Sequence, residues 1–431
     1  MNLLSPVLNN ISWHLIYRIA RLSLAFFISA WVARYLGPEE YGQLVYAVAI
    51  SEVIMLFWSQ GLKEVVIQQI RENKSNNKDE PIAAFQLMIL GNTILLGVLS
   101  ILLYFLELTN TIRLLSILCG IGIWFRAFEA FELWFHSELN VKVTVLIQFL
   151  SQLVYATANI SLILNNASLL WFGVTYLGQL AITGIGFLLV YRKFNSIKLV
   201  KIYFPIQKEI VLLGSFMIIA HLTLKSSFLL DRFVIEKLLN IESVGIYTAA
   251  MKLITVWVFI SKAISLSVLP VLTDEKFSIK FNLLSQKMFS WTLMISIVLT
   301  FVFSNFSTEL VSLIYGSKFT TTSDIFKILG FALPFLFLNE GIKASLIIKN
   351  KTKYYIFSMV LVSSTYLVLN FILIPIFGLV GSAYSFLISW FIGGFMYLLV
   401  FEETRPLFII IMKSIFSPIH YLTNTLINKI K

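Results

Sequence analysis

The sequence predicts an all-α integral membrane protein with about twelve transmembrane helices. Of its 431 residues, 58% are hydrophobic and only 13% are charged, whereas a soluble globular protein carries about 25% charged residues. The mean hydropathy is +0.87. The hydrophobic residues form stretches of about 20 residues, the length that a helix needs to cross a bilayer. The connections between these stretches are short, so no soluble catalytic domain is expected.

Twelve stretches meet this length requirement, and the Lys and Arg residues of their connections indicate the orientation. The predicted spans are 11–34, 43–65, 83–106, 112–135, 143–165, 170–191, 210–236, 245–269, 288–306, 326–348, 354–375 and 379–401. One alternating set of connections holds nineteen Lys and Arg residues, and the other set holds two. Because such residues collect on the cytoplasmic side, both chain ends are predicted to be cytoplasmic. The same pattern accounts for the formal charge of +11 without nucleic-acid binding.

A short internal repeat divides the chain into two halves. The motif LxxExxG that begins at Leu36 recurs from Leu239, an offset of 203 residues. Each copy lies where the first helix of a half turns into its second, and parallel repeats of this kind are typical of transporters. We therefore predict two six-helix halves and a cytoplasmic or interfacial tail, over residues 1–207, 208–404 and 405–431.

The first predicted span carries Arg18 and Arg21, which are costly in hydrocarbon. A cation at the centre of a span costs at least about 2.5–3.5 kcal/mol on insertion scales. The two arginines lie three residues apart and share a helix face, so we expect this face to be directed toward protein or water. For Arg18, a side chain that reaches the lipid headgroups is an equally good interpretation. For Arg21, one turn deeper, a binding role is favoured.

Predicted spans seven and eight add further cations. His221, Lys225, Arg232 and Glu236 fall within about 60° of one another on one helix face. Lys225 is near the mid-plane, so we predict a role in a cavity, whereas Arg232 and Glu236 are predicted to form a surface ion pair. A packed polar residue is the favoured interpretation of His221. In span eight, Lys252 is a candidate substrate contact, and pairing with an acid on another span is the alternative.

Carboxylates inside predicted spans are candidates for ion coupling. Glu52 in span two and Glu340 in span ten each lie about halfway across the membrane. Burial would allow either to carry a proton. The competing interpretation of Glu340 is an ion pair with Lys343, three residues further along the helix.

Span four contains Arg126, Glu129 and Glu132, which we interpret as a self-neutralising structural cluster. No motif in the sequence indicates an enzyme. Cys119 is the only cysteine, which excludes a cysteine-based metal site, and no phosphate-binding Gly-Lys loop is present. We therefore expect no catalytic residue, no metal, no other cofactor and no hydrolysis of ATP by this chain.

Four stretches of the sequence resemble the polysaccharide-exporter branch of the multidrug/oligosaccharidyl-lipid/polysaccharide superfamily. They are ARYLGPEEYGQLVYA (33–47), DRFVIEKLLNIESVGIYTAAMKL (231–253), LIYGSKF (313–319) and LIPIFGLVGSAYSFLIS (373–389). The similarity runs in order along nearly the whole chain and is greatest to the bacterial O-antigen flippases. It implies a MATE-like fold, in which two six-helix bundles related by a pseudo-two-fold axis surround a central cavity.

The resemblance also implies a function. A flippase of this kind would move undecaprenyl-pyrophosphate-linked oligosaccharide from the cytoplasmic to the periplasmic leaflet of the bacterial inner membrane, by alternating access. Coupling to H⁺ or Na⁺, contact with membrane lipid, and cooperation with a polysaccharide polymerase and a chain-length regulator would follow. Asp231 and Arg232 match the family pattern, with their role open. The predicted contacts to the pyrophosphate are Arg18, Arg21, Lys225 and Lys252.

Two other functions compete with this prediction. A drug or cation antiporter of the same superfamily should have a cavity dominated by unpaired acids, whereas the interior cations of this sequence outnumber its unpaired acids. A membrane glycosyltransferase or polymerase should carry a long extracytoplasmic loop with catalytic Arg or Asp residues. The longest such connection here, 307–325, is short and poor in charge.

Overall fold

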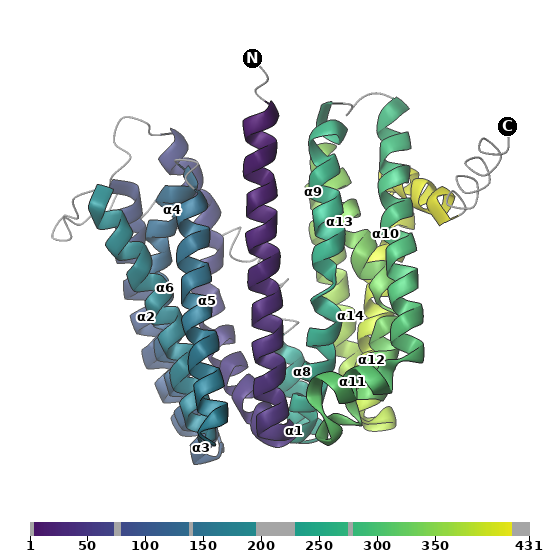
Figure 1. The fold of residues 1–431 in the computed structure, drawn as a ribbon. Helices are drawn as coiled ribbons and strands as arrows, with labels where there is room; N and C mark the ends of the chain where they lie inside the picture. The colour runs from purple at the N-terminus through teal and green to yellow at the C-terminus, as the bar shows by residue number, and fades with distance from the viewer. Residues whose placement is uncertain (1–3, 73–78, 138–140, 195–228, 275–278, 416–431) are drawn as a thin grey trace. The chain divides into compact units, whose positions relative to one another are not determined.

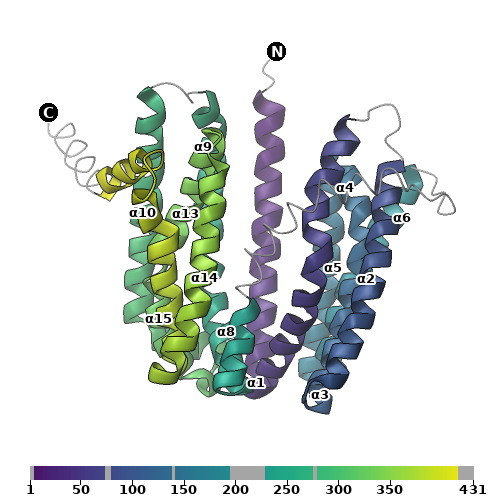
Figure 2. The same ribbon diagram turned by 180° about the vertical axis from the view of Figure 1, so that it is seen from behind.

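The computed structural model describes residues 4–72, 79–137, 141–194, 229–274 and 279–415. All regular secondary structure in these ranges is helical. The chain divides into two compact units, unit 1 (Met1–Phe233) and unit 2 (Val234–Lys431). The predicted boundary between residues 207 and 208 falls outside the described ranges. Figures 1 and 2 show the helices of both units from opposite sides.

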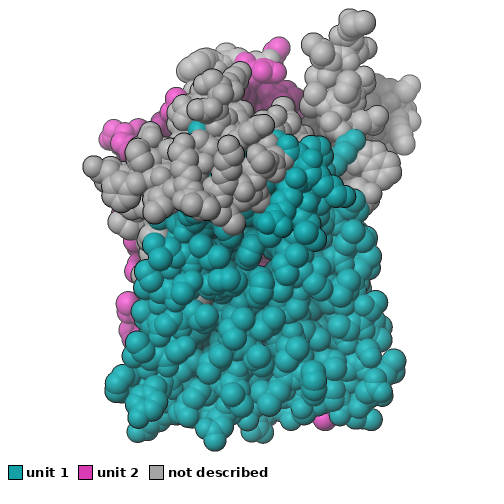
Figure 3. Space-filling model, turned by 90° about the vertical axis from the view of Figure 1, so that its left-hand side faces the viewer, with its two compact units in different colours: residues 1–233 teal, residues 234–431 magenta. Residues whose placement is uncertain are grey.

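Unit 1 is a bundle in which long apolar helices follow one another with short connections. Its elements are α1 (Leu4–Glu72), α2 (Asp79–Phe105), α3 (Asn110–Trp124), the 3₁₀ helix η1 (Phe125–Glu129), α4 (Ala130–Ser137), α5 (Val141–Leu164) and α6 (Leu169–Phe194). Many of its apolar side chains are exposed, such as Leu90, Ile101 and Leu189. Helices that face lipid have this composition. Figure 3 shows one face of the unit.

Helix α1 holds the first two predicted spans, which meet at a sharp turn (Figure 2). The turn is made at Gly37, whose φ of 78° and ψ of 173° suit glycine because it has no Cβ atom. Pro38 begins the second limb, where its missing N–H group costs nothing. The first copy of the repeated motif therefore forms the turn between two helices.

The second copy of the motif also begins a helix. Asn240 caps α8, and its side chain accepts a hydrogen bond of 2.8 Å from the backbone N–H of Ser243. Glu242 lies in the first turn of α8, where a negative charge interacts favourably with the helix dipole. The two copies thus begin helices by different means, one with a Gly-Pro turn and the other with an asparagine cap.

Unit 2 is also helical, with several breaks inside its long segments. Its elements are α8 (Ile241–Thr255), α9 (Val258–Asp274), α10 (Ile279–Asn305), α11 (Ser307–Tyr315), η2 (Ser317–Phe319), α12 (Thr322–Gly330), α13 (Leu333–Ile348), α14 (Thr352–Phe377), α15 (Leu379–Ser389), the π-helix η3 (Trp390–Phe395) and η4 (Met396–Leu399). Residues 405–415 form a further helix, which we call the tail helix. The connection predicted over 307–325 is thus largely helical.

The described helices agree with the predicted spans. Among the described residues, eight segments are long and apolar enough to cross a membrane, and α12 with α13, bent by 45°, make a ninth if they are one span. Eleven of the predicted spans coincide with described helices, and most of span 210–236 lies outside the described residues. The predicted all-helical membrane class is confirmed, and the chain is a multi-pass membrane protein.

Candidate functional site

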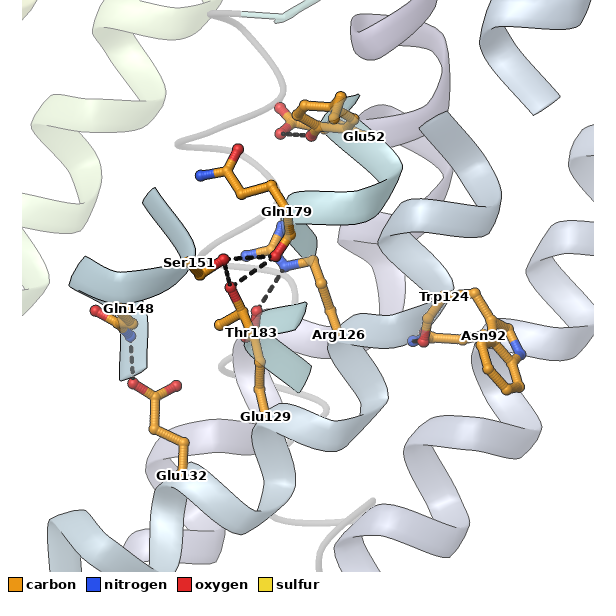
Figure 4. Close-up of polar contacts among 11 residues, drawn as sticks. Glu52, Asn92, Trp124, Arg126, Glu129, Glu132, Gln148, Ser151, Gln179 and Thr183 are labelled. Atoms are coloured by element: carbon orange, nitrogen blue, oxygen red, sulfur yellow. Dashed lines mark hydrogen bonds and ion pairs between the residues drawn. The ribbon is translucent and has the colours of Figure 1, made fainter. Parts of the chain in front are cut away.

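Unit 1 contains a network of polar side chains between its helices, parts of which Figure 4 shows. It draws on α1, η1, α4, α5 and α6, most of whose other residues are apolar. We define the unit 1 polar network as Arg21, Glu52, Arg126, Glu129, Glu132, Gln148, Ser151, Gln152, Tyr176, Gln179 and Thr183. Polar groups away from water need hydrogen-bond partners, and in this network the helices supply them to one another.

Arg21 is linked to Glu132 through the side chain of Gln148. An Nη1 group of Arg21, on α1, donates a hydrogen bond to the amide oxygen of Gln148, on α5. The amide nitrogen of Gln148 donates a bond of 2.7 Å to Oε1 of Glu132, on α4. Glu132 is buried, with 8% of its surface exposed. One amide therefore bridges a cation and a carboxylate from two other helices.

Arg126 and Glu129 form the ion pair that the sequence predicts. The distance from Nε of Arg126 to Oε1 of Glu129 is 3.0 Å. Both residues lie on η1, where residues three apart are aligned along the helix. Gly184 of α6 allows this segment to pack closely, because a Cβ atom there would lie 2.6 Å from the carbonyl oxygen of Phe125.

Glu132 was predicted to neutralise Arg126 within one cluster, and the structure extends this interpretation. Glu132 lies beyond η1 in the first turn of α4 and accepts its hydrogen bond from α5. The carboxylate therefore connects span four to α1 and α5. The three residues are not a self-contained structural cluster.

Glu52 lies beside the ion pair of Arg126 and Glu129. The hydroxyl of Tyr176 on α6 donates a long hydrogen bond of 3.4 Å to Oε1 of Glu52. Arg126 interacts electrostatically with both Glu52 and Tyr176. Glu52 is half-buried, and its partners come from other helices of unit 1. The candidate for ion coupling is thus part of the same network as the two arginines.

Neutral side chains of α5 and α6 complete the network (Figure 4). The amide nitrogen of Gln179 donates to the amide oxygen of Gln152 at 2.6 Å, and Ser151 donates to the carbonyl oxygen of Gln179 at 2.8 Å. Oγ1 of Thr183 lies 2.7 Å from Oγ of Ser151. We did not predict these residues from the sequence. The signal was their helical spacing, since Gln148, Ser151 and Gln152 share a face of an otherwise apolar segment.

The charged side chains of the network all have hydrogen-bond or ion-pair partners. The network holds three carboxylates, Glu52, Glu129 and Glu132, and two arginines. We predicted a cationic interior in which positive charges outnumber unpaired acids. Within the network, Arg126 pairs with Glu129 on the same 3₁₀ helix, and Arg21 is linked to Glu132 through Gln148. An anionic ligand would therefore have to compete with Gln148 or Glu129 for an arginine.

The predicted site residues of unit 2 are more scattered. Lys252 on α8 is half-buried, and Thr248, one turn before it, is buried. Nζ of Lys343 lies 5.6 Å from the centre of the Tyr355 ring. The ion pair between Glu340 and Lys343 that the sequence allowed is not formed among the described residues, because Lys343 is directed toward Tyr355 on α14.

The structure describes only some of the remaining predicted residues. Oδ1 of Asp231 accepts a hydrogen bond of 2.7 Å from the backbone N–H of Arg232. The ion pair between Arg232 and Glu236 stays a prediction. The side chain of Arg18, and residues His221 and Lys225, lie outside the described residues. In the described ranges, no group of three or more His, Cys, Asp or Glu residues could hold a metal ion.

The sequence motifs on which the resemblance was based make turns and close helix contacts. The hydroxyl of Tyr315 donates to the carbonyl oxygen of Ala249 at 3.1 Å, which ties α11 to α8. Gly378 has a φ of 61° between α14 and α15. A Cβ atom at Gly381 would overlap the carbonyl group of Leu373. Gly393 packs against the backbone of Val362 in the same way, which brings η3 close to α14.

The fold defines a multi-pass membrane protein with a polar interior, and comparison with known proteins gives its family. Residues 7–276 match the family model described as polysaccharide biosynthesis protein. The chain therefore belongs to this family. It is 26% identical over 410 residues to the capsular polysaccharide biosynthesis protein CapF of Staphylococcus aureus, with 91% of this chain and 98% of CapF covered.

Two solved structures show the same fold. A lipid II flippase, MurJ, in an inward closed conformation is similar with a TM-score of 0.73 and 19% identity, over 95% of this chain and 92% of MurJ. An inward-facing multidrug resistance transporter of the MATE family, in the MOP superfamily, is similar with a TM-score of 0.70 and 14% identity, over 92% and 96% of the two chains. The predicted MATE-like fold is confirmed.

Proposed function

We propose that this protein is a flippase that moves a lipid-linked oligosaccharide across the bacterial cytoplasmic membrane. The substrate would be an undecaprenyl-pyrophosphate-linked repeat unit of O-antigen or of another surface polysaccharide. Membership of the polysaccharide biosynthesis family and the fold shared with a lipid II flippase support this proposal. The observation that carries it is the link from Arg21 through Gln148 to Glu132 inside a membrane bundle.

Without substrate, Gln148 is a hydrogen-bond partner of Arg21, and an anion can replace it. The guanidinium group binds phosphate oxygens in pairs and more strongly than it binds a neutral amide oxygen. A pyrophosphate that reaches Arg21 would therefore displace the oxygen of Gln148. Arg18, Lys225 and Lys252 remain proposed contacts for the rest of the pyrophosphate or for the glycan.

Displacement of Gln148 would also change the surroundings of Glu132. The carboxylate would lose a hydrogen-bond partner from α5. Glu52 and Glu340 remain the proposed candidates for H⁺ or Na⁺ coupling. Alternating access of the two units would then be driven by an ion gradient or by removal of the product.

The charges at the two ends of unit 2 support an inner-membrane protein with cytoplasmic termini. At the end where α9 and α13 finish, the three described carboxylates are Asp274, Glu402 and Glu403. The seven described cations at this end are Lys280, Lys287, Lys349, Lys351, Lys353, Arg405 and Lys413. At the opposite end, the three described cations are Lys237, Lys318 and Lys327. The four described carboxylates there are Glu236, Glu242, Glu309 and Asp324. The more basic end would face the cytoplasm.

Deletion of the gene in its host tests the proposal. Lipid-linked repeat units should accumulate on the cytoplasmic side of the membrane, and surface polysaccharide should be lost. A plasmid copy should restore the polysaccharide. Normal polysaccharide in the deletion strain, with unchanged lipid-linked intermediates, would contradict the proposal. If the flippase works together with a polymerase and a chain-length regulator, the length of the surface polysaccharide should also change.

One observation favours a second function, an ion-coupled multidrug or cation antiporter. The unit 1 polar network has more carboxylates than arginines, and the fold is shared with a MATE transporter. Efflux of cationic dyes by cells that express the protein separates the two functions. Efflux with normal polysaccharide would support the antiporter, whereas the flippase should confer none. Turnover of lipid-linked sugar by the purified chain would instead indicate a glycosyltransferase or polymerase.

A further inference from the structure

The tail helix (405–415) is packed across the bundle of unit 2. In Figure 1 it runs across α10 near the more basic end of the unit. Leu407, Ile410 and Ile411 are buried in the same apolar cluster as residues of α10 and α13. With the buried Ser414, these positions follow the spacing of one helix face. The tail helix is therefore a fixed part of unit 2.

Hydrogen bonds set the level at which the tail helix meets α10. Ser414 donates to the carbonyl oxygen of Gln286 at 3.2 Å, and Ser290 donates to the carbonyl oxygen of Ser414 at 3.2 Å. The sequence predicts that the membrane span within α10 begins at residue 288, between these two contacts. Trp291 is 59% exposed at the same level. Tryptophan is enriched at the boundary between membrane and water, so the tail helix lies at this boundary.

The outer surface of the tail helix is mainly apolar, with an exposed cation near each end. Phe408, Met412 and Ile415 fall within about 60° of one another around the helix axis. Met412 and Ile415 are exposed, and Phe408 is half-buried. Arg405, in the first turn, lies about 20° from Met412 around the axis, and Lys413 lies about 80° further round, beyond the exposed Ile409. A helix with an apolar outer surface and exposed cations near its ends fits into a membrane interface, with its apolar residues toward the acyl chains.

A further cation lies in the neighbouring turn of unit 2, beside the start of the tail helix. Lys351 donates from Nζ to the carbonyl oxygen of Glu403 at 2.8 Å, and so lies beside the start of the tail helix. Arg405 donates from Nε to the carbonyl oxygen of Leu399 at 2.9 Å. This contact holds the guanidinium group of Arg405 near the predicted boundary between membrane and water. The cations at this end outnumber the carboxylates, so an anionic partner is favoured.

We propose that the tail helix is a binding site for anionic phospholipid headgroups, with Arg405 and Lys413 as the phosphate contacts. The exposed apolar residues, among them Met412 and Ile415, would contact the acyl chains of the same leaflet. The lipid would fasten α10 and α13 of unit 2 to the membrane surface. This inference does not depend on the transported substrate.

A depth measurement tests the placement of the tail helix. The full-length protein with Cys119→Ala would carry a spin label at Met412→Cys or at Lys413→Cys, in vesicles of phosphatidylcholine and phosphatidylglycerol. We expect the label at 412 to be relaxed mainly by oxygen, which dissolves in the bilayer. The label at 413 should be relaxed mainly by a water-soluble nickel complex. Equal access of the nickel complex to both labels would overturn the proposal.

A lipid-retention measurement tests the headgroup site. Native mass spectrometry of the full-length protein would count the phosphatidylglycerol molecules retained after extraction from mixed vesicles. The double variant Arg405→Gln/Lys413→Gln should bind phosphatidylglycerol about five-fold more weakly for each cation removed. The control Lys318→Gln/Lys327→Gln, at the opposite end of unit 2, should retain it as the wild type does. Equal retention by both double variants, or equal loss from both, would overturn the proposal.

Discussion

Gln148 lies between an arginine and a carboxylate that belong to different helices of unit 1. An isolated charge inside a membrane protein is costly, and an ion pair there needs further hydrogen bonds. The amide satisfies both requirements, because its oxygen accepts from Arg21 and its nitrogen donates to Glu132. We therefore regard Gln148 as a positioning residue that holds Arg21 ready for an anion.

Replacement of Gln148 by methionine should impair both folding stability and transport. Methionine has a similar length but neither accepts from Arg21 nor donates to Glu132, so two buried charged groups each lose a partner. Loss of one partner from a buried polar group costs about 1–3 kcal/mol in the free energy of unfolding. Thermal unfolding of the purified protein and complementation of the deletion strain are the measurements.

The control for this variant is Gln152→Met, one turn along α5. It removes the hydrogen bond between two neutral amides, Gln152 and Gln179, and leaves the charged groups paired. We expect reduced thermal stability with surface polysaccharide retained. If the two variants restore polysaccharide equally well, Gln148 has no special role at Arg21.

At the scale of elements, the turns and breaks of the helices depend on particular residues. The 3₁₀ segment η1 aligns Arg126 with Glu129, and Gly184 lets α6 approach it. Gly381 has the same function where α15 passes the end of α14. These positions explain why motifs that resemble a family of exporters are rich in glycine. The glycines allow the helices to pack closely, whereas other residues form the unit 1 polar network.

The two glycines Gly381 and Gly97 should respond in opposite ways to alanine. A Cβ atom at Gly381 would overlap the carbonyl group of Leu373, and such overpacking costs about 1–3 kcal/mol in stability. Gly97 in α2 has no neighbour within 4 Å of an added Cβ atom. There, alanine should gain up to about 1 kcal/mol from its higher helix propensity. Thermal unfolding of both variants is the measurement, and a loss of similar size at both positions would contradict this packing.

The turn before the tail helix provides a pH-dependent contribution to stability. The hydroxyl of Tyr354 hydrogen-bonds to the carboxylate of Glu403 and lowers its pKa, and the nearby Lys353 and Lys351 lower it further. A carboxyl group with a lowered pKa stabilises the fold above its unfolded value, about 4.3 for glutamate. This contribution is lost as the pH falls through the folded value.

The variant Tyr354→Phe should therefore be less stable than the wild type at neutral pH, and the difference should disappear in acid. The phenylalanine ring would keep the packing of Tyr354 against Phe401, whose ring centre is 4.8 Å away. Unfolding temperatures measured from pH 7 down to pH 3 would show the trend. A difference that stays constant over this range would contradict the role of the hydrogen bond.

For the whole molecule, hydrophobicity and charge predicted the membrane class and the positions of the spans. These features depend on local sequence, because each span must satisfy the bilayer by itself. Local spacing was also sufficient for the pair of Arg126 and Glu129. The link between Arg21 and Gln148 joins residues 127 positions apart, which no local pattern specifies. For this reason the partners of the interior charges could not be predicted from the sequence, and the predicted cationic interior stays a prediction.

Transport by the purified protein in vesicles tests the central claim most directly. An undecaprenyl-pyrophosphate-linked oligosaccharide would be placed in the inner leaflet, and its appearance at the outer surface would be followed with a membrane-impermeant glycosidase. Wild-type protein and the control Arg192→Ala, an exposed cation at the end of α6, should expose the glycan at the same rate. Arg21→Ala should reduce the rate at least ten-fold, with the protein inserted normally. A rate for Arg21→Ala equal to that of wild type would contradict the role of the network, and no exposure by wild type would contradict the flippase itself.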